Sequence, residues 1–585
     1  MSIFKRNKNG KRRISKQLLF DYSSKEGREE TVAFLMDGML AERERQNRNF
    51  AKCKAYYNGE HDSKKHFAAL CGSYDIPWEP TCSTDAYIHV ESQIDVSVPD
   101  FEFSPREAED SENARKREYI TRYIVDKSDL EYKNFRNERN IGILGSAVFK
   151  VAITENEKGI SDVAVETPSP EQIYADPTST TVDGCEYIAY VYPMHINKAA
   201  RIFSEDMKRL GLESEDIRDI SGYGDRFKNP FAENSSDISS EYYRDNQTVT
   251  VTEFWFRHPK SGTAAVSTGE GEVLCEYESG DVGLILLVGE KEIRYVPKYW
   301  STTGCTMFPF CVYNRTPTTD TLFGDSELLQ LIPLMDAADR EMIYAQLNSA
   351  FCANDIVIAE ENAFAEGAGP DNRPGAVWKL RPGMMGKVQR LGNLGYAEGN
   401  LYSNVDRMRD IMRETVGNYT SFQGDEPDKV TTATGIALLN DRAKSRKKIK
   451  LVDKMAAYAR LYSLVDRSAL ECYDDGRHIL IGAPDGTDEG VIFNISDFGG
   501  KDGYIPDVDV KIHVGDGLEN SKAFTVSALT DLIKTPVTED NYKLVEAFIE
   551  LIGLPVRNEL TEILEERFSQ NKNTAVKEKE AYGSR

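Results

Sequence analysis

Residue types that could perform catalysis are abundant in this sequence, but none stands in a spacing that catalysis requires. An enzyme needs a positioned nucleophile, base, metal or phosphate cradle. The sequence has no GxxxxGK[ST] loop for nucleotide phosphates and no HExxH, EF-hand or GxSxG motif. Asp474 and Asp475 could bind Mg²⁺, but a chain with 96 acidic residues contains many such pairs by chance. We therefore expect a protein that is not an enzyme and needs no cofactor.

Histidine and cysteine give no local metal-binding pattern either. The seven histidines have no ligand spacing, and the nine cysteines are odd in number and never form CxxC. We expect no metal site, and reduced thiols that are mostly buried. The histidines are His61, His66, His89, His195, His258, His478 and His513, and the cysteines are Cys53, Cys71, Cys82, Cys185, Cys275, Cys305, Cys311, Cys352 and Cys472.

Length, composition and charge restrict the class of protein. A chain of 585 residues exceeds what one hydrophobic core usually supports, so we expect several packed parts. No apolar run approaches the roughly 20 residues that span a bilayer, and no signal peptide follows the basic first residues, so we expect no membrane insertion. The net charge of -24 argues against a general nucleic-acid binder. Any contact with DNA must be local or weak.

In the first half of the chain, hydrophobic periodicity predicts helices followed by short strands. We expect residues 1–20 to form a flexible basic arm and residues 223–246, rich in Asn, Ser and Asp, to form a surface insertion. The predicted helices are 25–57, 108–127 and 129–144, with Gly145-Ser146 ending the last of them. The predicted strands are 148–153, 162–165, 188–192, 248–256 and 283–288.

The centre of the chain predicts a helix, a small β-rich insert and a second helix. After a strand at 308–313, Asp325 or Ser326 can cap a helix. Pro333 cannot donate an interior helical hydrogen bond, so it kinks that helix or opens a new one; we favour a new helix over 333–351. Short strands are expected at 355–359 and 376–380, separated by the Gly/Pro-rich 366–375 and closed by 381–383. The second helix covers 400–416.

Beyond a polar loop at 421–432, one long helix is predicted over 433–473. Its second half carries a clean apolar stripe, whereas residues 441–454 hold seven basic residues against two acids, pointing all round the helix. A helix that is polar on every side usually crosses open space or lies against a charged partner. Strands are expected at 478–482, 491–495 and 507–514, and short helices at 520–533, 538–552 and 555–568. The fold class is therefore α+β.

The order of these elements resembles the portal proteins of tailed bacteriophages. The features that carry the resemblance are the 308–310 strand, Gly324-Asp325-Ser326-Glu327-Leu328, the following helix to Phe351, the insert ending in Arg381-Pro382-Gly383, the second helix, the polar loop and the long basic helix. Weaker matches are Tyr56-Tyr57-Asn58-Gly59 and residues 145–150. No single motif is specific, and the resemblance covers most of residues 33–568.

The resemblance implies a ring subunit, commonly dodecameric, with wing, stem, clip and crown parts around a channel. It divides the chain into the basic arm (1–20), a first wing part (21–323), stem helix 1 (324–351), the clip (352–396), stem helix 2 (397–420), the tunnel loop (421–432), a long wing helix with wing strands (433–515), a helical crown (516–569) and a flexible tail (570–585). The implied partners are double-stranded viral DNA, the large terminase, the major capsid and scaffolding proteins, and head–tail adaptors. The implied location is a capsid vertex of the virion, after synthesis in the cytoplasm of the host bacterium.

Three groups of candidate site residues follow. The tunnel-loop residues are Gln423, Asp425, Glu426, Asp428 and Lys429. The residues expected to pair between neighbouring stems are Asp336, Asp339, Arg340, Arg407 and Arg413, since both helices carry charges of each sign. Arg442, Lys444, Arg446, Lys447 and Lys448 could make weak phosphate contacts or neutralise acidic groups of neighbouring subunits.

Two other classes of protein remain as alternatives. A terminase or nuclease predicts a phosphate loop or a metal cluster, which the sequence lacks. An adaptor or capsid protein would also lack catalysis, but adaptors are usually much shorter and shell proteins lack this order of elements. A ring of twelve chains would carry a net charge of about -290, and such an acidic channel would let DNA slide without sticking.

Overall fold

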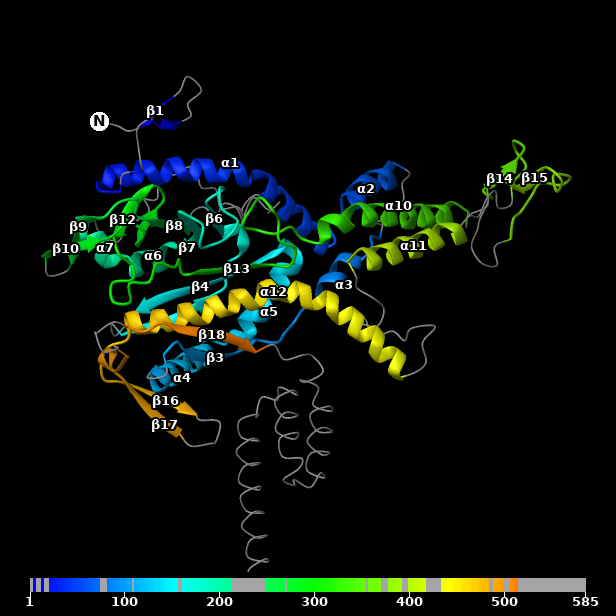
Figure 1. Cartoon of the computed structure of the whole chain (residues 1–585). Helices are drawn as coiled ribbons and strands as arrows, with labels where there is room; N and C mark the ends of the chain where they lie inside the picture. The colour runs from blue at the N-terminus through cyan, green and yellow to red at the C-terminus, as the bar shows by residue number, and fades with distance from the viewer. Residues whose placement is uncertain are drawn as a thin grey trace, which may run out of the picture. The chain divides into compact units, whose positions relative to one another are not determined.

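The structure is a computed structural model of the chain (Figure 1). It describes residues 4–6, 12–14, 20, 22–73, 81–107, 110–155, 160–211, 248–268, 271–352, 356–369, 377–391, 398–416, 433–482, 488–498 and 505–513. The chain divides into two compact units, one of residues 1–97 and 120–499 and one of residues 98–119 and 500–585. The predictions for 223–246, 421–432 and 520–568 lie outside the described residues.

The predicted α+β class is confirmed: long helices are combined with several small sheets, and all pairings between described strands are antiparallel. The described helices with named bounds are α1 Lys25–Tyr57, α2 Asp62–Ser73, α3 Asp85–Glu91, α4 Ser111–Lys127, α5 Leu130–Leu144, α6 Ile196–Ile202, α7 Ser204–Arg209, α10 Leu328–Cys352, α11 Glu398–Val416 and α12 Ala433–Cys472. The basic stretch predicted as a flexible arm contains an antiparallel strand pair, β1 Phe4–Arg6 and β2 Arg12–Ile14.

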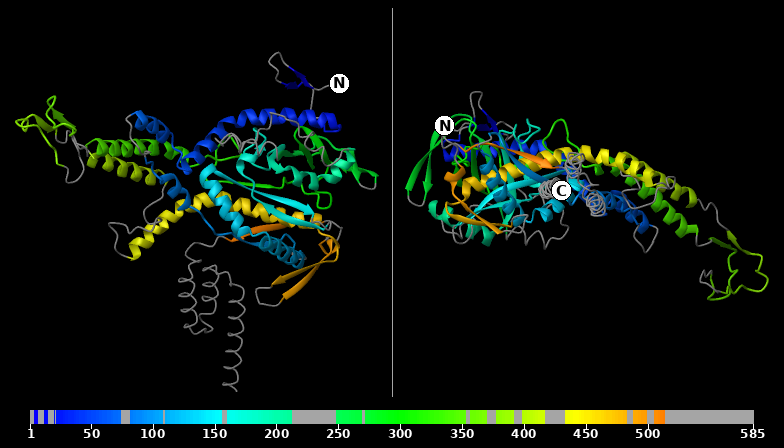
Figure 2. Two further views of the ribbon diagram at one scale, coloured as in Figure 1. Left: turned by 180° about the vertical axis from the view of Figure 1, so that it is seen from behind. Right: turned by 60° about the horizontal axis from the view of Figure 1, so that its bottom comes forward.

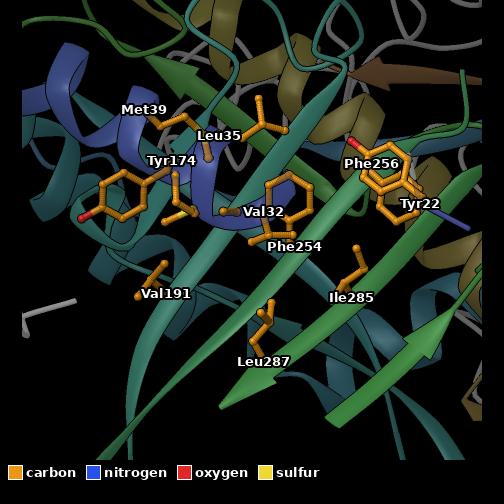
Figure 3. Close-up of a cluster of buried hydrophobic side chains, with 12 residues drawn as sticks. Tyr22, Val32, Leu35, Met39, Tyr174, Val191, Phe254, Phe256, Ile285 and Leu287 are labelled. Atoms are coloured by element: carbon orange, nitrogen blue, oxygen red, sulfur yellow. The ribbon is translucent and has the colours of Figure 1, made fainter. Parts of the chain in front are cut away.

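A five-stranded sheet in the larger unit is covered by helices on both faces. Its order is β12 Lys291–Val296, β11 Val282–Val288, β8 Thr248–Arg257, β7 Tyr187–His195 and β6 Ile173–Ala175. Side chains alternate between the faces of a strand, so Ile285 and Leu287 pack with Val32 and Leu35 of α1 (Figure 3). The alternate residues of β11, Leu286 and Val288, pack with α6 and α7 instead; the packed residues of these helices include Ala199 and Met207.

A three-stranded sheet supports the long helix α12. Its order is β13 Phe310–Asn314, β4 Ser146–Glu155 and β5 Ser161–Glu166, and α12 packs against all three strands. Within the predicted apolar stripe of α12, Tyr458 and Val465 are fully covered, whereas Val452 is 68% exposed. Gly145 ends α5 with a positive φ of 84°. A Cβ at Gly145 would lie 2.4 Å from the backbone carbon of Asp325, so only glycine fits this turn.

Helix α10 corrects the prediction that a new helix begins at Pro333. A single helix runs from Leu328 to Cys352 with Pro333 inside it. The Ser326 hydroxyl accepts a hydrogen bond from the backbone N–H of Leu328, which confirms the predicted cap. An interior proline costs about 3 kcal/mol, but Leu331 and Met335 on either side are buried in one core. Each such side chain contributes about 1.5–3 kcal/mol, which keeps the helix continuous.

The predicted insert between the helices has its second strand in a different place. β14 Ile356–Ala359 confirms the first strand and pairs with β15 Val388–Leu391 rather than with residues 376–380. Val377 is exposed, and Leu380 makes only an isolated bridge to Phe364. The predicted turn at 381–383 is present, with Gly383 at φ 84°. The turn therefore precedes β15, the strand that pairs with β14.

Three other strand pairs complete the described structure. β9 Gly262–Thr268 and β10 Gly271–Tyr277 form a hairpin that was not predicted, whereas β16 Arg477–Gly482 and β17 Asp488–Phe493 agree with the predicted strands. In the smaller unit, β3 Asp100–Pro105 pairs with β18 Val508–His513, the latter as predicted. Arg106 holds this pair by ion pairs to Asp507 and Asp509.

Candidate functional site

The candidate site is the set of helices α10, α11 and α12, which flank the insert and the polar loop singled out in the sequence. Helices α10 and α11 lie side by side in both views of the larger unit (Figures 1 and 2). Because β14 and β15 pair with each other, the chain leaves along α10 and returns along α11. The two helices therefore present a long hairpin with a small β segment at its end.

The hairpin is anchored at its base by one hydrophobic core. Leu328, Leu331 and Ile332 of α10 and Met412 of α11 are buried together with side chains of α1, α3 and α5. The α1 residues in this core are Phe50, Cys53 and Tyr56. A shared core of this kind fixes the base of the hairpin on the body of the larger unit.

A buried charge network, which we call the Glu138 network, anchors α12. The Glu138 carboxylate lies 3.0 Å from Lys454 Nζ and 3.2 Å from an Arg315 guanidinium nitrogen. The Lys454 and Glu138 side chains are each only 3% exposed. Asp95 adds a second carboxylate 3.3 Å from Lys454. Buried charges persist only when they are paired and hydrogen-bonded, so this network sets the position of α12 against α5.

Neighbouring residues of α12 hold the strand and loop beside it. Asp453 accepts a hydrogen bond from the backbone N–H of Asn314 at 2.7 Å, and burial raises the pKa of its carboxyl group. The Arg460 guanidinium donates to the carbonyl oxygens of Phe310 and Phe308. These polar contacts join α12 to β13 beside the apolar packing. The basic first half of α12, with Arg442 and Lys448, is helical as predicted, and the contacts of its side chains lie outside what the structure describes.

The acidic residues predicted to pair between subunits have partners within the chain. Asp336 accepts hydrogen bonds from the Tyr56 hydroxyl and from Ser63 Oγ. Asp339 is fully buried and lies 2.5 Å from His61 Nδ1. Burial alone would lower the pKa of His61, but the hydrogen bond to Asp339 and its charge outweigh burial and raise this pKa. Pairing of either acid with a neighbouring subunit stays a prediction.

The predicted arginines of the hairpin lie on more accessible positions. Arg340 donates to the carbonyl oxygen of Asp336 on its own helix, and Arg413 lies 3.5 Å from Asp410. Arg407 is exposed. Exposed i,i+3 and i,i+4 pairs contribute only a few tenths of a kcal/mol, so Arg407 and Arg413 are available to another chain at little cost.

The β segment at the end of the hairpin exposes large apolar side chains. Met385 is 87% exposed, Val377 82% and Ile358 54%. Among its described residues, the packed apolar groups are Phe364 against Trp378 and the buried Ala363. A small β segment with exposed apolar groups is typical of a surface that a partner completes. Sequence periodicity predicted a small insert here, but it did not reveal which side chains are exposed.

Two clusters were missed by reasoning from sequence. The Glu138 network and the contact of His61 with Asp339 join residues that are far apart along the chain; His61 and Asp339 are 278 positions apart. Spacing rules detect ligands and ion pairs only when they lie within one motif. The one local signal was Lys454, a basic residue at the edge of the apolar stripe of α12.

The comparisons with known proteins give one family. Residues 89–316 match the family model described as Phage P22-like portal protein. No curated protein matches the chain. The matched span ends before α10, so α10, α11 and α12 lie outside it. Of the ordered features that carried the resemblance in the sequence, the span contains only the strand at 308–313 and the weaker match at 145–150.

Proposed function

We propose that this chain, whose residues 89–316 match the phage P22-like portal protein family model, is a portal subunit that forms a ring at one capsid vertex. The family match is the observation that carries the proposal. Portal proteins are structural, so the chain acts as a conduit and not as an enzyme. The location that follows is the virion capsid.

The proposed parts of the subunit follow the helices of the candidate site. Helices α10 and α11 are the stem, the β segment between them is the clip, and α12 is the long wing helix. Residues 421–432 are the tunnel loop, and residues 516–569 are the crown. The supporting observations are the anchored hairpin with a β segment at its end, and the packing of α12 across a three-stranded sheet of the matched domain.

Ring neighbours are proposed to contact one another along the stem. Arg340 and Arg407 are exposed and Arg413 is partly exposed, so these three arginines of the predicted set are accessible to an acidic partner. Exposed apolar side chains on the same hairpin, Tyr344, Tyr402 and Ile411, add area that a neighbouring subunit would bury. Asp336 and Asp339 already have partners within the chain, and their pairing with a neighbouring subunit stays a prediction.

The proposed channel carries double-stranded DNA past an acidic wall. The chain has 96 acidic and 72 basic residues. Repulsion between an acidic channel wall and the DNA phosphates prevents tight binding of the DNA. The terminase, scaffolding and capsid proteins and head–tail adaptors are the proposed partners. None of the described helices combines the length and apolarity needed to cross a bilayer.

Reversing the charge of the proposed tunnel loop tests the conduit. Replacing Asp425, Glu426 and Asp428 with Lys changes the loop charge by six units per subunit. We expect DNA affinity to rise at low salt and fall steeply as salt increases, because added phosphate contacts release counterions. Packaging and ejection should stall while the ring still assembles.

Gel-shift titrations over a salt series and the length of packaged genomes measure these effects. A matched variant with Asp→Asn, Glu→Gln and Asp→Asn at the same three positions separates loss of repulsion from new attraction. Unchanged infectivity and genome length in the lysine variant would show that the loop does not line the channel.

A further inference from the structure

Three side chains from separate segments meet beside α10. His61 directly precedes α2, Cys82 lies in the segment before α3, and Asp339 is in the middle of α10. One potential ligand atom from each of them lies within 4.8 Å of the others. His61 and Asp339 are fully buried and Cys82 is half-buried. A nitrogen, a sulfur and an oxygen donor are therefore collected at one place, and the thiol is the least buried of the three groups.

The hydrogen bond of one ring nitrogen fixes how the His61 ring can act. Nε2 lies 3.1 Å from the carbonyl oxygen of Tyr56, which can only accept, so Nε2 carries the proton. In the neutral ring, Nδ1 then presents a lone pair, and it points at Asp339 Oδ2 2.5 Å away. Two lone pairs that face each other require a proton or a metal cation between them. A histidine that ligates a metal commonly donates its other N–H to a backbone carbonyl in this way.

The carboxylate of Asp339 is oriented in a similar way. Its Oδ1 accepts a hydrogen bond from the backbone N–H of Ser83 at 2.7 Å, which leaves Oδ2 for the His61 side. Ser83 follows Cys82, so the same short segment supplies the thiol and orients the carboxylate. The Ser83 hydroxyl is buried and has no hydrogen-bond partner among the residues that the structure describes, as expected where a further polar group, such as a metal-bound water, completes the surroundings.

We propose that His61, Cys82 and Asp339 form a binding site for a divalent transition metal of the zinc class. Imidazole nitrogen, thiolate sulfur and carboxylate oxygen together suit Zn²⁺ and leave the fourth tetrahedral position to water. Ligand distances of about 2.0–2.2 Å place Nδ1 and Oδ2 about 3.3 Å apart. Binding thus requires these two atoms to separate by less than about 1 Å.

The bound metal would add a shared ligand contact to segments that already meet through Phe67 packed on Ile343 and through the Ser63–Asp336 hydrogen bond. It would fix the start of α2 and the segment before α3 onto the helix α10, next to the core that anchors the hairpin. The site is therefore structural. It does not depend on the proposed portal function, because each ligand comes from the same chain.

Cobalt binding to the full chain tests the site. The chain is first treated with a chelator under reducing conditions to remove bound metal. Added Co²⁺ should then bind at one ion per chain, with a thiolate-to-cobalt charge-transfer band and the visible bands of tetrahedral cobalt. Zn²⁺ should displace the Co²⁺ and abolish these bands. Cys82→Ser should remove the charge-transfer band, and His61→Gln should lower the affinity by more than the roughly 10–100-fold that loss of an outer-shell partner costs. Cys305→Ser, at another half-buried thiol, should leave the spectrum unchanged.

The outcomes separate a metal site from a simple buried ion pair. If the chain binds no stoichiometric Co²⁺ or Zn²⁺, or if Cys82→Ser retains the charge-transfer band, the proposal is overturned. Far-UV circular dichroism of the Cys82→Ser chain verifies its folding, since serine preserves the shape of the side chain. This variant keeps the test decisive even if His61→Gln fails to fold.

Discussion

A chain in which Val377 and Met385 are both replaced by Glu should fold and form rings but fail to package DNA. Among the described residues between α10 and α11, these two have the most exposed large apolar side chains. Burying each of them in a partner contributes about 1.5–3 kcal/mol, and each new carboxylate must also lose its water. We propose that the terminase, the packaging motor, docks on this segment, so its dissociation constant should rise by at least about 100-fold.

ATP-driven packaging with purified terminase and with proheads that contain the variant measures this effect. Leu274→Glu is the matched control, since Leu274 is also strongly exposed but lies on β10, outside this segment. Normal packaging by the Val377/Met385 variant would remove the segment from the proposed docking surface. A packaging defect in the Leu274 variant would show that loss of packaging is not specific to changes in the segment between α10 and α11.

Glu138→Gln should lower the free energy of unfolding of the larger unit by about 3–5 kcal/mol. The change keeps the shape of the side chain but leaves Lys454, only 3% exposed, and Arg315, 10% exposed, without their shared carboxylate. Removing one partner of a buried ion pair costs this much because the remaining charge cannot return to water. Asp95 still neutralises Lys454 but not Arg315, and its carboxylate is more exposed than that of Glu138.

Urea denaturation followed by far-UV circular dichroism checks this prediction. The control is Glu44→Gln, which removes the acid of the exposed Glu44–Arg48 pair on α1, where both side chains are more than 70% exposed. An exposed pair contributes little, so this variant should change the free energy of unfolding by less than about 0.5 kcal/mol. Equal effects of the two changes would contradict the role assigned to the Glu138 network.

The helices could be predicted closely because their signals are local. The helix at 25–57 has the predicted bounds, α12 ends one residue earlier than predicted, and the cap at Ser326 and the stop at Gly145 are both present. Each of these features depends on a few neighbouring residues. The start of α10 was predicted wrongly at Pro333 because the continuity of this helix does not depend on local propensity. Burial of residues on both sides of Pro333 keeps the helix intact.

Strand partners and the candidate site were less accessible to sequence reasoning. Residues 376–380 are the more apolar run, but the folded chain pairs β14 with 388–391, which holds Gln389 and Arg390 between its apolar ends. The contact of His61 with Cys82 and Asp339 depends on three segments that approach only in the folded chain. The exposed apolar groups near Met385 lack any periodic signal, since exposure is a property of the fold.

The most direct test of the proposed function is negative-stain electron microscopy of the purified full-length chain. We expect class averages of closed rings, about twelve subunits around a central hole, because the proposal assigns the exposed apolar and charged groups of the α10–α11 hairpin to contacts with identical neighbours. Light scattering of the same sample should give a matching mass over a wide range of salt. Compact monomers at every protein and salt concentration would contradict the assignment of this chain as a ring-forming portal subunit.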